Sequence, residues 1–225
     1  MTQVIACSTP EGIVLATDSC ATWFDPAAGM KHFHLKKLLR LGSHAAIVSA
    51  GAGIGVEMGA AFQQFIQKRK VEGIEEMIQL ALPFFTDRYG QYVRERRMER
   101  LPSPEETDRQ EEEAFPLSGV YFVLAGYSFR DRHQPYDLRL FGCDEEGMPI
   151  RSHPPSPIIV IPRSLSMEKR LDVELQRRAP LDDLSSLCLS FLKKRSAEEE
   201  VGPPFHVAAI TPAGFKEIMK EEAKR

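Results

Sequence analysis

The sequence predicts an α+β fold in which two packed β-sheets carry pairs of helices on their outer faces. Strand-like segments are grouped in blocks near the start, the middle and the end of the chain, and pairs of helix-like segments separate these blocks. A helix pair that follows a block of strands must bury its apolar side against one face of a sheet. A doubly wound fold would instead alternate single strands with single helices, so the order of the elements disfavours it.

The expected strands are apolar, β-branched runs bounded by Gly, Pro and Asp turn signals. They lie at residues 2–8, 12–19, 37–41, 45–49, 119–128, 135–144, 148–152 and 205–211. Pro10 and Gly12 in the first connection predict that the chain opens with a β-hairpin. Turn signals at Pro26 and Gly29 predict a loop over residues 21–34.

The expected helices carry apolar residues at intervals of three and four. They begin near residues 53 and 74 and, later in the chain, span residues 166–178, 181–195 and 215–224. The second helix is expected to bury one face, and Pro83 is the position where this helix can kink. The residues of that face are Ile74, Ile78, Leu82 and Phe85. The last helix is expected to be short and charged.

We expect the whole chain, residues 1–225, to form one domain, because no linker or internal repeat divides it and its length suffices to bury a core. Residues 93–114 differ from the rest in containing almost no large apolar side chains. This polar, charged composition predicts an insertion that is either a solvated extension of the preceding helix or a disordered loop.

The composition argues against several classes of protein. A net charge of -3 gives no electrostatic reason to expect binding to nucleic acid or to an anionic membrane. No apolar run approaches the roughly 20 residues that span a bilayer, and the first residues lack the basic and apolar segments of a signal peptide. A cytoplasmic location is therefore expected. The scattered cysteines are expected to be reduced core thiols, and they are Cys7, Cys20, Cys143 and Cys188.

The segment AIVSAGAGIGVEMG at residues 46–59 is typical of a strand, a glycine-rich turn and a helix, which is also the outline of a dinucleotide-binding turn. A phosphate-binding fingerprint needs Gly or Ala at its sixth position. Counted from Gly51 that position is Val56, and counted from Gly53 it is Met58. The segment therefore predicts either close packing of the helix on the strand or a backbone N–H at Gly51 that serves other chemistry.

The N-terminus carries a candidate nucleophile. Thr2 follows Met1, and a small second residue allows removal of the initiator Met, which leaves a free α-amino group beside the Thr2 hydroxyl. Three further residues accompany Thr2: Asp18 at the end of the opening hairpin, Lys37, and Gly51 at the end of the fourth expected strand. Together they form a candidate site for acyl transfer.

With these residues the chain resembles the proteasome β-subunit family of N-terminal-nucleophile hydrolases, the threonine peptidases of bacterial and archaeal proteasomes. The resemblance depends on Thr2 and on three short motifs, which are GIVLATDSCAT (12–22), KKL (36–38) and AG (50–51). The intervals from Thr2 to Asp18 and from Lys37 to Gly51 match the family, and about three extra residues separate Asp18 from Lys37. The match is specific over the first 55 residues and loose beyond them.

The resemblance implies a four-layer αββα sandwich of two antiparallel sheets flanked by helix pairs. It also implies a threonine-type endopeptidase without a cofactor or a metal, assembled into a homo-oligomeric ring whose sites face an enclosed lumen. The expected substrates are peptides or unfolded proteins. The cleavage preference, the size of the ring and any ATPase partner are left open.

The residue types suit this chemistry. A threonine hydroxyl needs a base to act as a nucleophile, and the α-amino group of Thr2 has an ordinary pKa close enough to neutral to be that base. Lys37 would lower the pKa of this amine by charge repulsion, and Asp18 would pair with Lys37 and fix it. The Gly51 N–H would donate to the oxyanion of the tetrahedral intermediate.

Several alternatives remain open. Asp18 can pair with Lys36 in place of Lys37, since neighbouring strand residues face opposite sides and only one of the two lysines can qualify. Asp18 and Lys37 can also form an ordinary ion pair, and a retained Met1 would block the Thr2 amine. A non-catalytic structural or binding subunit of the same fold is the alternative function.

The family's supporting residues are altered. Ser164 or Ser166 is expected to replace its first supporting serine and Glu198 its late aspartate, whereas Val201 stands where its second serine would be. The six histidines show no metal or triad spacing, so a metal site at His32 and His34 is disfavoured.

Overall fold

The computed structural model of the chain describes residues 2–25, 29–99, 118–145, 148–197 and 201–221. Within these residues the protein has a mixed α/β structure with four helices and three sheets, in which all of the strand pairings are antiparallel. The predicted α+β class is compatible with this structure. None of the helices in this described part of the chain combines the length and the apolar character needed to cross a bilayer.

The first sheet contains both ends of the described chain. Its strands, in spatial order, are β10 (Ile158–Ile161), β1 (Val4–Ser8), β2 (Ile13–Thr17), β11 (Phe205–Thr211) and β12 (Gly214–Glu221). The predicted opening hairpin is confirmed, because β1 and β2 pair directly with Val4 opposite Thr17. This register brings the start of β1 beside the end of β2.

The second sheet is formed by the middle of the chain. Its strands, in spatial order, are β5 (Leu38–Arg40), β6 (Ala45–Gly51), β7 (Ser118–Tyr127), β8 (Tyr136–Glu145) and β9 (Arg151–Ser152). A separate hairpin of β3 (Cys20–Asp25) and β4 (Gly29–His34) leads from the first sheet to the second.

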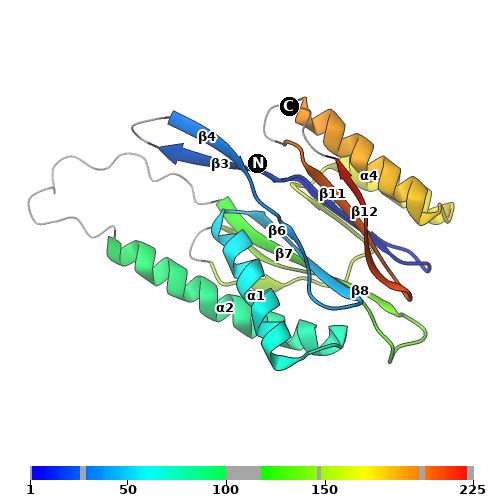
Figure 1. Cartoon of the computed structure of the whole chain (residues 1–225), viewed down its shortest axis with the longest axis horizontal. Helices are drawn as coiled ribbons and strands as arrows, with labels where there is room; N and C mark the ends of the chain where they lie inside the picture. The colour runs from blue at the N-terminus through cyan, green and yellow to red at the C-terminus, as the bar shows by residue number, and fades with distance from the viewer. Residues whose placement is uncertain (1, 26–28, 100–117, 146–147, 198–200, 222–225) are drawn as a thin grey trace, which may run out of the picture.

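Each of the two five-stranded sheets is contacted by a pair of helices. The helices are α1 (Ile54–Arg69), α2 (Ile74–Glu99), α3 (Leu165–Gln176) and α4 (Leu181–Ser196). Three clusters of buried apolar side chains fill the interior: one between α1–α2 and the second sheet, one between the sheets, and one between the first sheet and α3–α4. Figure 1 shows α1 and α2 on one side of the strands and α4 on the other.

Strand β1 shows how this packing determines the sequence pattern. Val4 and Ala6 belong to the cluster between the sheets, whereas Ile5 and Cys7 belong to the cluster under α3 and α4. Both faces of the strand are buried, so it appears in the sequence as a continuous apolar run rather than an alternating one.

Residues 21–34 do not form the predicted loop. They form most of the β3–β4 hairpin, in which Cys20 lies opposite His34 and Asp25 lies opposite Gly29. The turn signals close a hairpin here, and residues 26–28 lie outside the described part of the chain. Thr, Trp and Phe in β3 and His and Phe in β4 are β-branched or aromatic types that favour strands.

The predicted helix at residues 215–224 is wrong, because residues 214–221 form strand β12. Apolar residues at positions 215, 218 and 219 have helix-like spacing, but this strand contains a β-bulge. Val207 lies opposite Met219 and Ala208 opposite Glu217, so Ile218 is the extra residue. A bulge breaks the two-residue period that would have indicated a strand. Residues 222–224 lie outside the described part.

Strand β10 was not predicted. Its four residues, IIVI, pair with β1. They lie between Pro157 and Pro162, and because proline is uncommon inside strands, this short segment was not recognised as one. The strand predicted at residues 148–152 is reduced to Arg151–Ser152.

The four predicted helices that begin near residues 53, 74, 166 and 181 are confirmed, with small shifts of their ends. In α2 the buried stripe differs from the one predicted, and it consists of Ile74, Met77, Ala81, Phe85 and Tyr89. Ile78 and Leu82 pack at its margin. Pro83 lies inside the helix, which continues through it to Glu99. Residues 93–99 are thus a helical extension, and residues 100–114 lie outside the described part.

Candidate active site

A buried carboxylate lies where β2 ends and the chain turns into β3. Asp18 is 0% exposed, and its Oδ1 accepts a hydrogen bond from the Gln3 N–H at 2.9 Å. Its Oδ2 accepts one from the Cys20 N–H at 2.9 Å and one from Lys37 Nζ at 3.0 Å. Three donors therefore hold the carboxylate in one orientation.

Lys37 reaches the same point from the chain segment just before β5. Its side chain is 2% exposed, and Nζ also donates to the Cys20 carbonyl oxygen. Lys36, the residue before it, is 56% exposed and lies 3.6 Å from Glu217. The structure thus brings Lys37, and not Lys36, to Asp18, as strand alternation requires of one of the two.

Burial shifts the titration of both partners. The loss of hydration lowers the pKa of the Lys37 ammonium below its ordinary value of 10.5, and the nearby Asp18 charge opposes this only in part. Burial also raises the pKa of the Asp18 carboxyl above 3.8, against the opposing effects of Lys37 and of the N–H donors. The two charges therefore depend on each other and on their hydrogen bonds, because an unpaired charge at this depth is strongly unfavourable.

Thr2 lies beside this ion pair. The peptide bond between Thr2 and Gln3 supplies the N–H that Asp18 accepts, which places the Thr2 Cα within about 5 Å of Asp18 Oδ1. Gln3 is held in turn, since its side-chain amide donates to the Ile161 carbonyl oxygen at 3.1 Å. Thr2 is half-buried, and Met1 lies outside the described part of the chain.

Gly51 ends β6 with a backbone conformation suited to glycine. Its φ is +87°, and a Cβ there would lie 1.9 Å from the Gly119 carbonyl oxygen. Gly55 is also constrained, because its Cβ would meet the Val120 side chain at 2.8 Å, whereas a Cβ on Gly53 would have nothing within 4 Å. Gly51 and Gly55 therefore have a steric reason to be glycine and Gly53 does not.

The strand register gives the direction of the Gly51 N–H. Gly51 is the last residue of β6, and every second N–H group along a strand points to the same side. Ser49, two residues before Gly51, donates its N–H to the Lys37 carbonyl oxygen at 3.1 Å. Gly51 therefore directs its N–H to the side of β6 on which Lys37 lies. Gly51 is exposed there, because β5 starts only at Leu38, opposite Val48.

The supporting residues are placed differently. Ser164 is the N-cap of α3, where its Oγ accepts from the Met167 N–H at 3.5 Å and lies 3.2 Å from the Ser166 hydroxyl. Val201 is 5% exposed and belongs to the apolar cluster under α3 and α4. Glu198 lies outside the described part of the chain. No contact joins Ser164 or Ser166 to Thr2 among the described interactions.

Cys20 takes part in this site through its backbone, a role that a residue type does not predict. Its N–H and its carbonyl oxygen contact Asp18 and Lys37 respectively, and its Sγ lies 3.8 Å from His32 Nδ1. Within the described residues no cluster of three side chains suited to a metal ion is found.

Ser49 is a second residue that we did not predict. Its Oγ is buried, and no hydrogen-bond partner for it lies among the described residues. It also restricts α1, because a Cβ on Gly59 would lie 2.5 Å from that oxygen.

In comparisons with known proteins, no family model and no curated protein matches the chain. Its function therefore has to be argued from the geometry of this site and from the motifs in the sequence.

Proposed function

We propose that the chain is a threonine-type peptidase subunit of the N-terminal-nucleophile hydrolase class, similar to a proteasome β-subunit. One observation carries the proposal. The buried Asp18–Lys37 ion pair lies directly beside the first described residue, Thr2, and Asp18 accepts the N–H of the peptide that follows it. A catalytic role gives a reason for burying this ion pair beside Thr2, because Lys37 can then lower the pKa of the Thr2 amine.

The architecture supports the same proposal. Two antiparallel sheets that pack face to face, each with a helix pair outside, are what a four-layer αββα sandwich requires. We assign that sandwich to this chain. Thr2 then lies at the start of β1, where a strand from each sheet approaches the N-terminus.

The proposed reaction begins after removal of Met1. The α-amino group takes the proton of the Thr2 hydroxyl, and Thr2 Oγ attacks the carbonyl carbon of the scissile peptide. The Gly51 N–H stabilises the oxyanion, a contact worth roughly 3–4 kcal/mol in comparable sites. The C–N bond breaks as the amine leaves with a proton, and water then hydrolyses the ester on Thr2.

Lys37 and Asp18 set the electrostatics of this step. A positive Lys37 lowers the pKa of the nearby α-amine and so favours its basic form. Asp18 holds Lys37 in place through Oδ2 and holds the Thr2–Gln3 peptide through Oδ1. One carboxylate thereby fixes both the cation and the nucleophile, which limits the reorganisation needed during the reaction.

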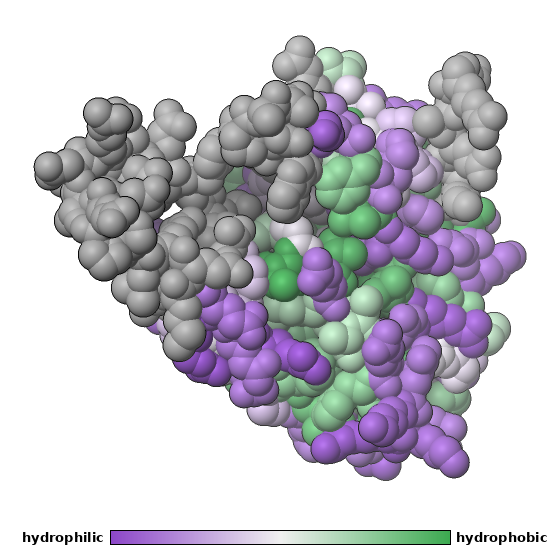
Figure 2. Space-filling view, turned by 60° about the vertical axis from the view of Figure 1, so that its left-hand side comes forward, coloured by the Kyte–Doolittle hydropathy of each residue, from purple (hydrophilic) through white to green (hydrophobic). Residues whose placement is uncertain are grey.

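The assembly is proposed on the same basis. We assign the chain to a homo-oligomeric ring in the cytoplasm that acts on peptides or unfolded proteins. Figure 2 shows apolar residues gathered along the middle of one face with hydrophilic residues on both sides, a distribution that suits a protein interface.

A non-catalytic subunit of the same fold is the second candidate. It is favoured by the altered surroundings of Thr2: Ser164 is engaged as a helix cap, and Val201 is buried where a second serine would be needed. A subunit with this ion pair but without the supporting hydroxyls would keep the fold and lose the activity.

Intact-mass measurement of the purified chain, with and without an inhibitor directed at N-terminal threonine, separates the two candidates. The peptidase predicts loss of Met1 and one covalent adduct, and Thr2→Ala should remove the adduct without changing the assembly. A chain that retains Met1 and forms no adduct would contradict the peptidase and support the non-catalytic subunit.

A further inference from the structure

One face of the β3–β4 hairpin carries a cysteine and two histidines. Cys20 lies directly opposite His34 in the strand register, so the two side chains are on the same face of the hairpin. His32 and His34 are two residues apart in β4, and alternation along the strand places both of them on that face. The pairing of the strands thus gathers three side chains of types that bind metal ions.

The hairpin leaves these side chains accessible. Figure 1 shows β3 and β4 extending away from the two five-stranded sheets. Cys20 is partly exposed, and His32 and His34 are exposed. An ion in solution can therefore reach all three side chains without any opening of the fold.

Cys20 and His32 already have the spacing of two ligands of one metal ion. Cys20 Sγ lies 3.8 Å from His32 Nδ1. Zinc binds sulfur at about 2.3 Å and imidazole nitrogen at about 2.0–2.1 Å, so angles near the tetrahedral value separate the two ligand atoms by roughly 3.6–3.8 Å. The pair can bind such an ion without a change in the backbone.

His34 supplies a third ligand by rotation of its side chain. Among the described residues no set of three such side chains converges on one point, so the His34 imidazole has to turn toward the Cys20 sulfur. Directly opposite residues of an antiparallel pair have Cβ atoms about 4.5–5.5 Å apart, a distance that an imidazole can span. His34 is exposed, and exposed side chains change rotamer readily.

The register adds what the sequence lacked. A metal site at His32 and His34 was disfavoured because the six histidines have no metal-binding spacing of their own. The structure brings Cys20 to these two residues from the neighbouring strand. A thiolate beside two imidazoles is a set that suits zinc and disfavours magnesium or calcium, which prefer oxygen ligands.

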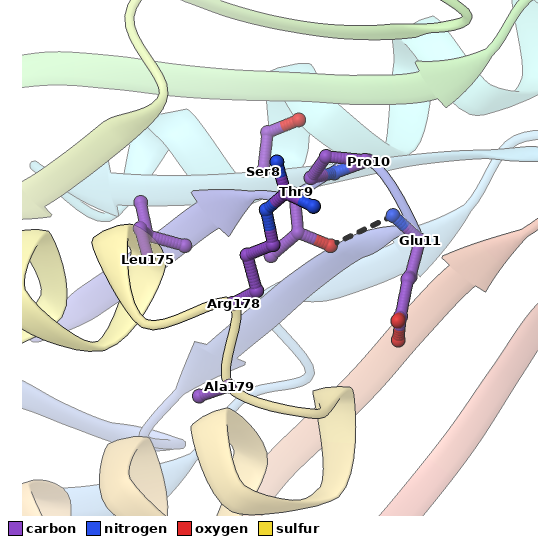
Figure 3. Close-up of a pocket in the computed structure, with 7 residues that line it drawn as sticks. All are labelled: Ser8, Thr9, Pro10, Glu11, Leu175, Arg178 and Ala179. Carbon is purple, nitrogen blue, oxygen red and sulfur yellow. Dashed lines mark hydrogen bonds between the residues drawn. The ribbon is translucent and has the colours of Figure 1, made fainter.

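The surface depression at the end of β1 has no comparable set of side chains. It is lined by residues 8–11 of the β1–β2 turn and by Leu175, Arg178 and Ala179 at the end of α3. Figure 3 shows the Arg178 side chain and the Glu11 carboxylate on different sides of the turn, so these two charges do not face one ligand.

We propose that Cys20, His32 and His34 form a binding site for a zinc ion. The Cys20 thiol loses its proton to solvent as the Zn–S bond forms, and each neutral imidazole contributes one nitrogen. His32 binds through Nδ1 and keeps its proton on Nε2. Water completes the tetrahedral shell, because this face of the hairpin is exposed.

Cobalt serves as the spectroscopic probe of this site in the untagged full chain with its thiols reduced. Binding of Co²⁺ to a thiolate gives a near-ultraviolet charge-transfer band, and Zn²⁺ is expected to displace the cobalt and abolish the band. Competition with a chelator should give a zinc Kd below about 10 μM. Zinc should also slow the alkylation of Cys20 by iodoacetamide at least about tenfold, because the bound thiolate is no longer free to react.

Variants identify the ligands. Cys20→Ser should remove the charge-transfer band, and His32→Ala and His34→Ala should each weaken zinc binding at least about tenfold. Both histidines are exposed, so their replacement should leave the melting temperature unchanged. His133→Ala is the matched control, because His133 is exposed in the connection between β7 and β8, and its loss should leave zinc binding unchanged.

Three results would overturn the proposal: no charge-transfer band in the wild-type chain, a band that persists in Cys20→Ser, or unchanged zinc affinity in either His32→Ala or His34→Ala. The first result would leave Cys20 and His32 as a hydrogen-bonded pair only. The titration involves no turnover, so its outcome does not depend on whether Thr2 is a nucleophile.

Discussion

Asp18 Oδ2 and Lys37 Nζ lie 3.0 Å apart, and both side chains are almost completely removed from water. The two residues belong to different parts of the fold, since Asp18 follows β2 of the first sheet and Lys37 precedes β5 of the second. A buried pair of this kind rarely increases stability over an apolar pair, but removal of one partner leaves an uncompensated charge. Under the proposed function, its position beside Thr2 serves the reaction of the Thr2 hydroxyl.

The first prediction concerns Lys37 and its neighbour. Lys37→Met leaves the Asp18 carboxylate buried without its cation, so we expect a loss of about 3–5 kcal/mol in the free energy of unfolding. Peptide hydrolysis should fall at least about 100-fold. Chemical denaturation and initial rates with a peptide substrate measure the two effects.

Lys36→Met is the matched control. Lys36 is 56% exposed and its contact with Glu217 is weak, so both the stability and the activity should change little. Equal effects of the two substitutions would show that the assignment of Lys37 is wrong. In a double-mutant cycle, Asp18→Asn and Lys37→Met should be less harmful together than the sum of their separate effects, by roughly 1–3 kcal/mol.

The second prediction concerns the end of β6. Gly51→Ala places a Cβ against the Gly119 carbonyl oxygen at a positive φ, so the backbone must move, at a cost of at least about 2 kcal/mol. The Gly51 N–H would move with it, and kcat should fall by about 10²–10³-fold. Thermal unfolding and steady-state kinetics of the variant give both values.

Gly53→Ala separates this effect from a general sensitivity of the turn. A Cβ on Gly53 meets nothing within 4 Å, and its φ of -55° suits any residue. We expect a change of less than about 1 kcal/mol and full activity. If Gly51→Ala also retained full activity, the Gly51 N–H would not be the oxyanion donor.

The contact between Asp18 and Lys37 was predicted from the motifs that resemble the proteasome β-subunit family and from the intervals between them. Strand alternation required a choice between Lys36 and Lys37. The roles of Thr2 and Gly51 remain predictions. The contacts of Cys20 with the ion pair were not predicted, because they are made by backbone atoms, which every residue type possesses.

The main errors in the predicted fold lie in two hairpins. In β3–β4 the turn signals were given more weight than the β-branched and aromatic residues beside them. In β12 a bulge breaks the two-residue period of the strand. The long apolar strands and the helices α1, α3 and α4 were predicted because local pattern and tertiary burial agree there.

The third prediction uses the cysteines. Cys20 is the partly exposed one among the four, and the other three are buried. A hydrogen bond to Cys7, together with burial, raises the pKa of the Cys188 thiol and makes it less reactive still. In the folded protein, iodoacetamide should therefore modify one thiol at least about ten times faster than the others.

Intact mass after limited alkylation counts the modified thiols, and peptide mapping identifies them. Cys20→Ser should remove the fast reaction. The Cys20 N–H and carbonyl oxygen contact Asp18 and Lys37, so an alkyl group on Cys20 is expected to disturb the ion pair and peptide hydrolysis should fall as labelling proceeds. Fast labelling at Cys7, Cys143 or Cys188 would contradict the described packing.

The fourth prediction is the dependence of stability on pH. The pKa of Asp18 is higher in the folded chain than the ordinary 3.8. Between these two values the folded state holds a proton that the unfolded state has lost. The contribution of Asp18 to the free energy of unfolding therefore falls as the pH rises from about 3.8 through the raised pKa. The pKa of Lys37 is lower in the folded chain than 10.5, so its contribution rises with pH from the lowered pKa up to 10.5.

The two groups together should therefore make the fold least stable in the interval between their shifted pKa values, where both are charged. The measurement is the free energy of unfolding of the wild-type chain minus that of the Asp18→Asn/Lys37→Met variant, taken from acid to alkaline pH, because the difference cancels the other titrating groups. We expect this difference to have a minimum between the two shifted pKa values and to rise on both sides. A maximum there would mean that the attraction between Asp18 and Lys37 outweighs their desolvation, which would reverse the direction of both pKa shifts.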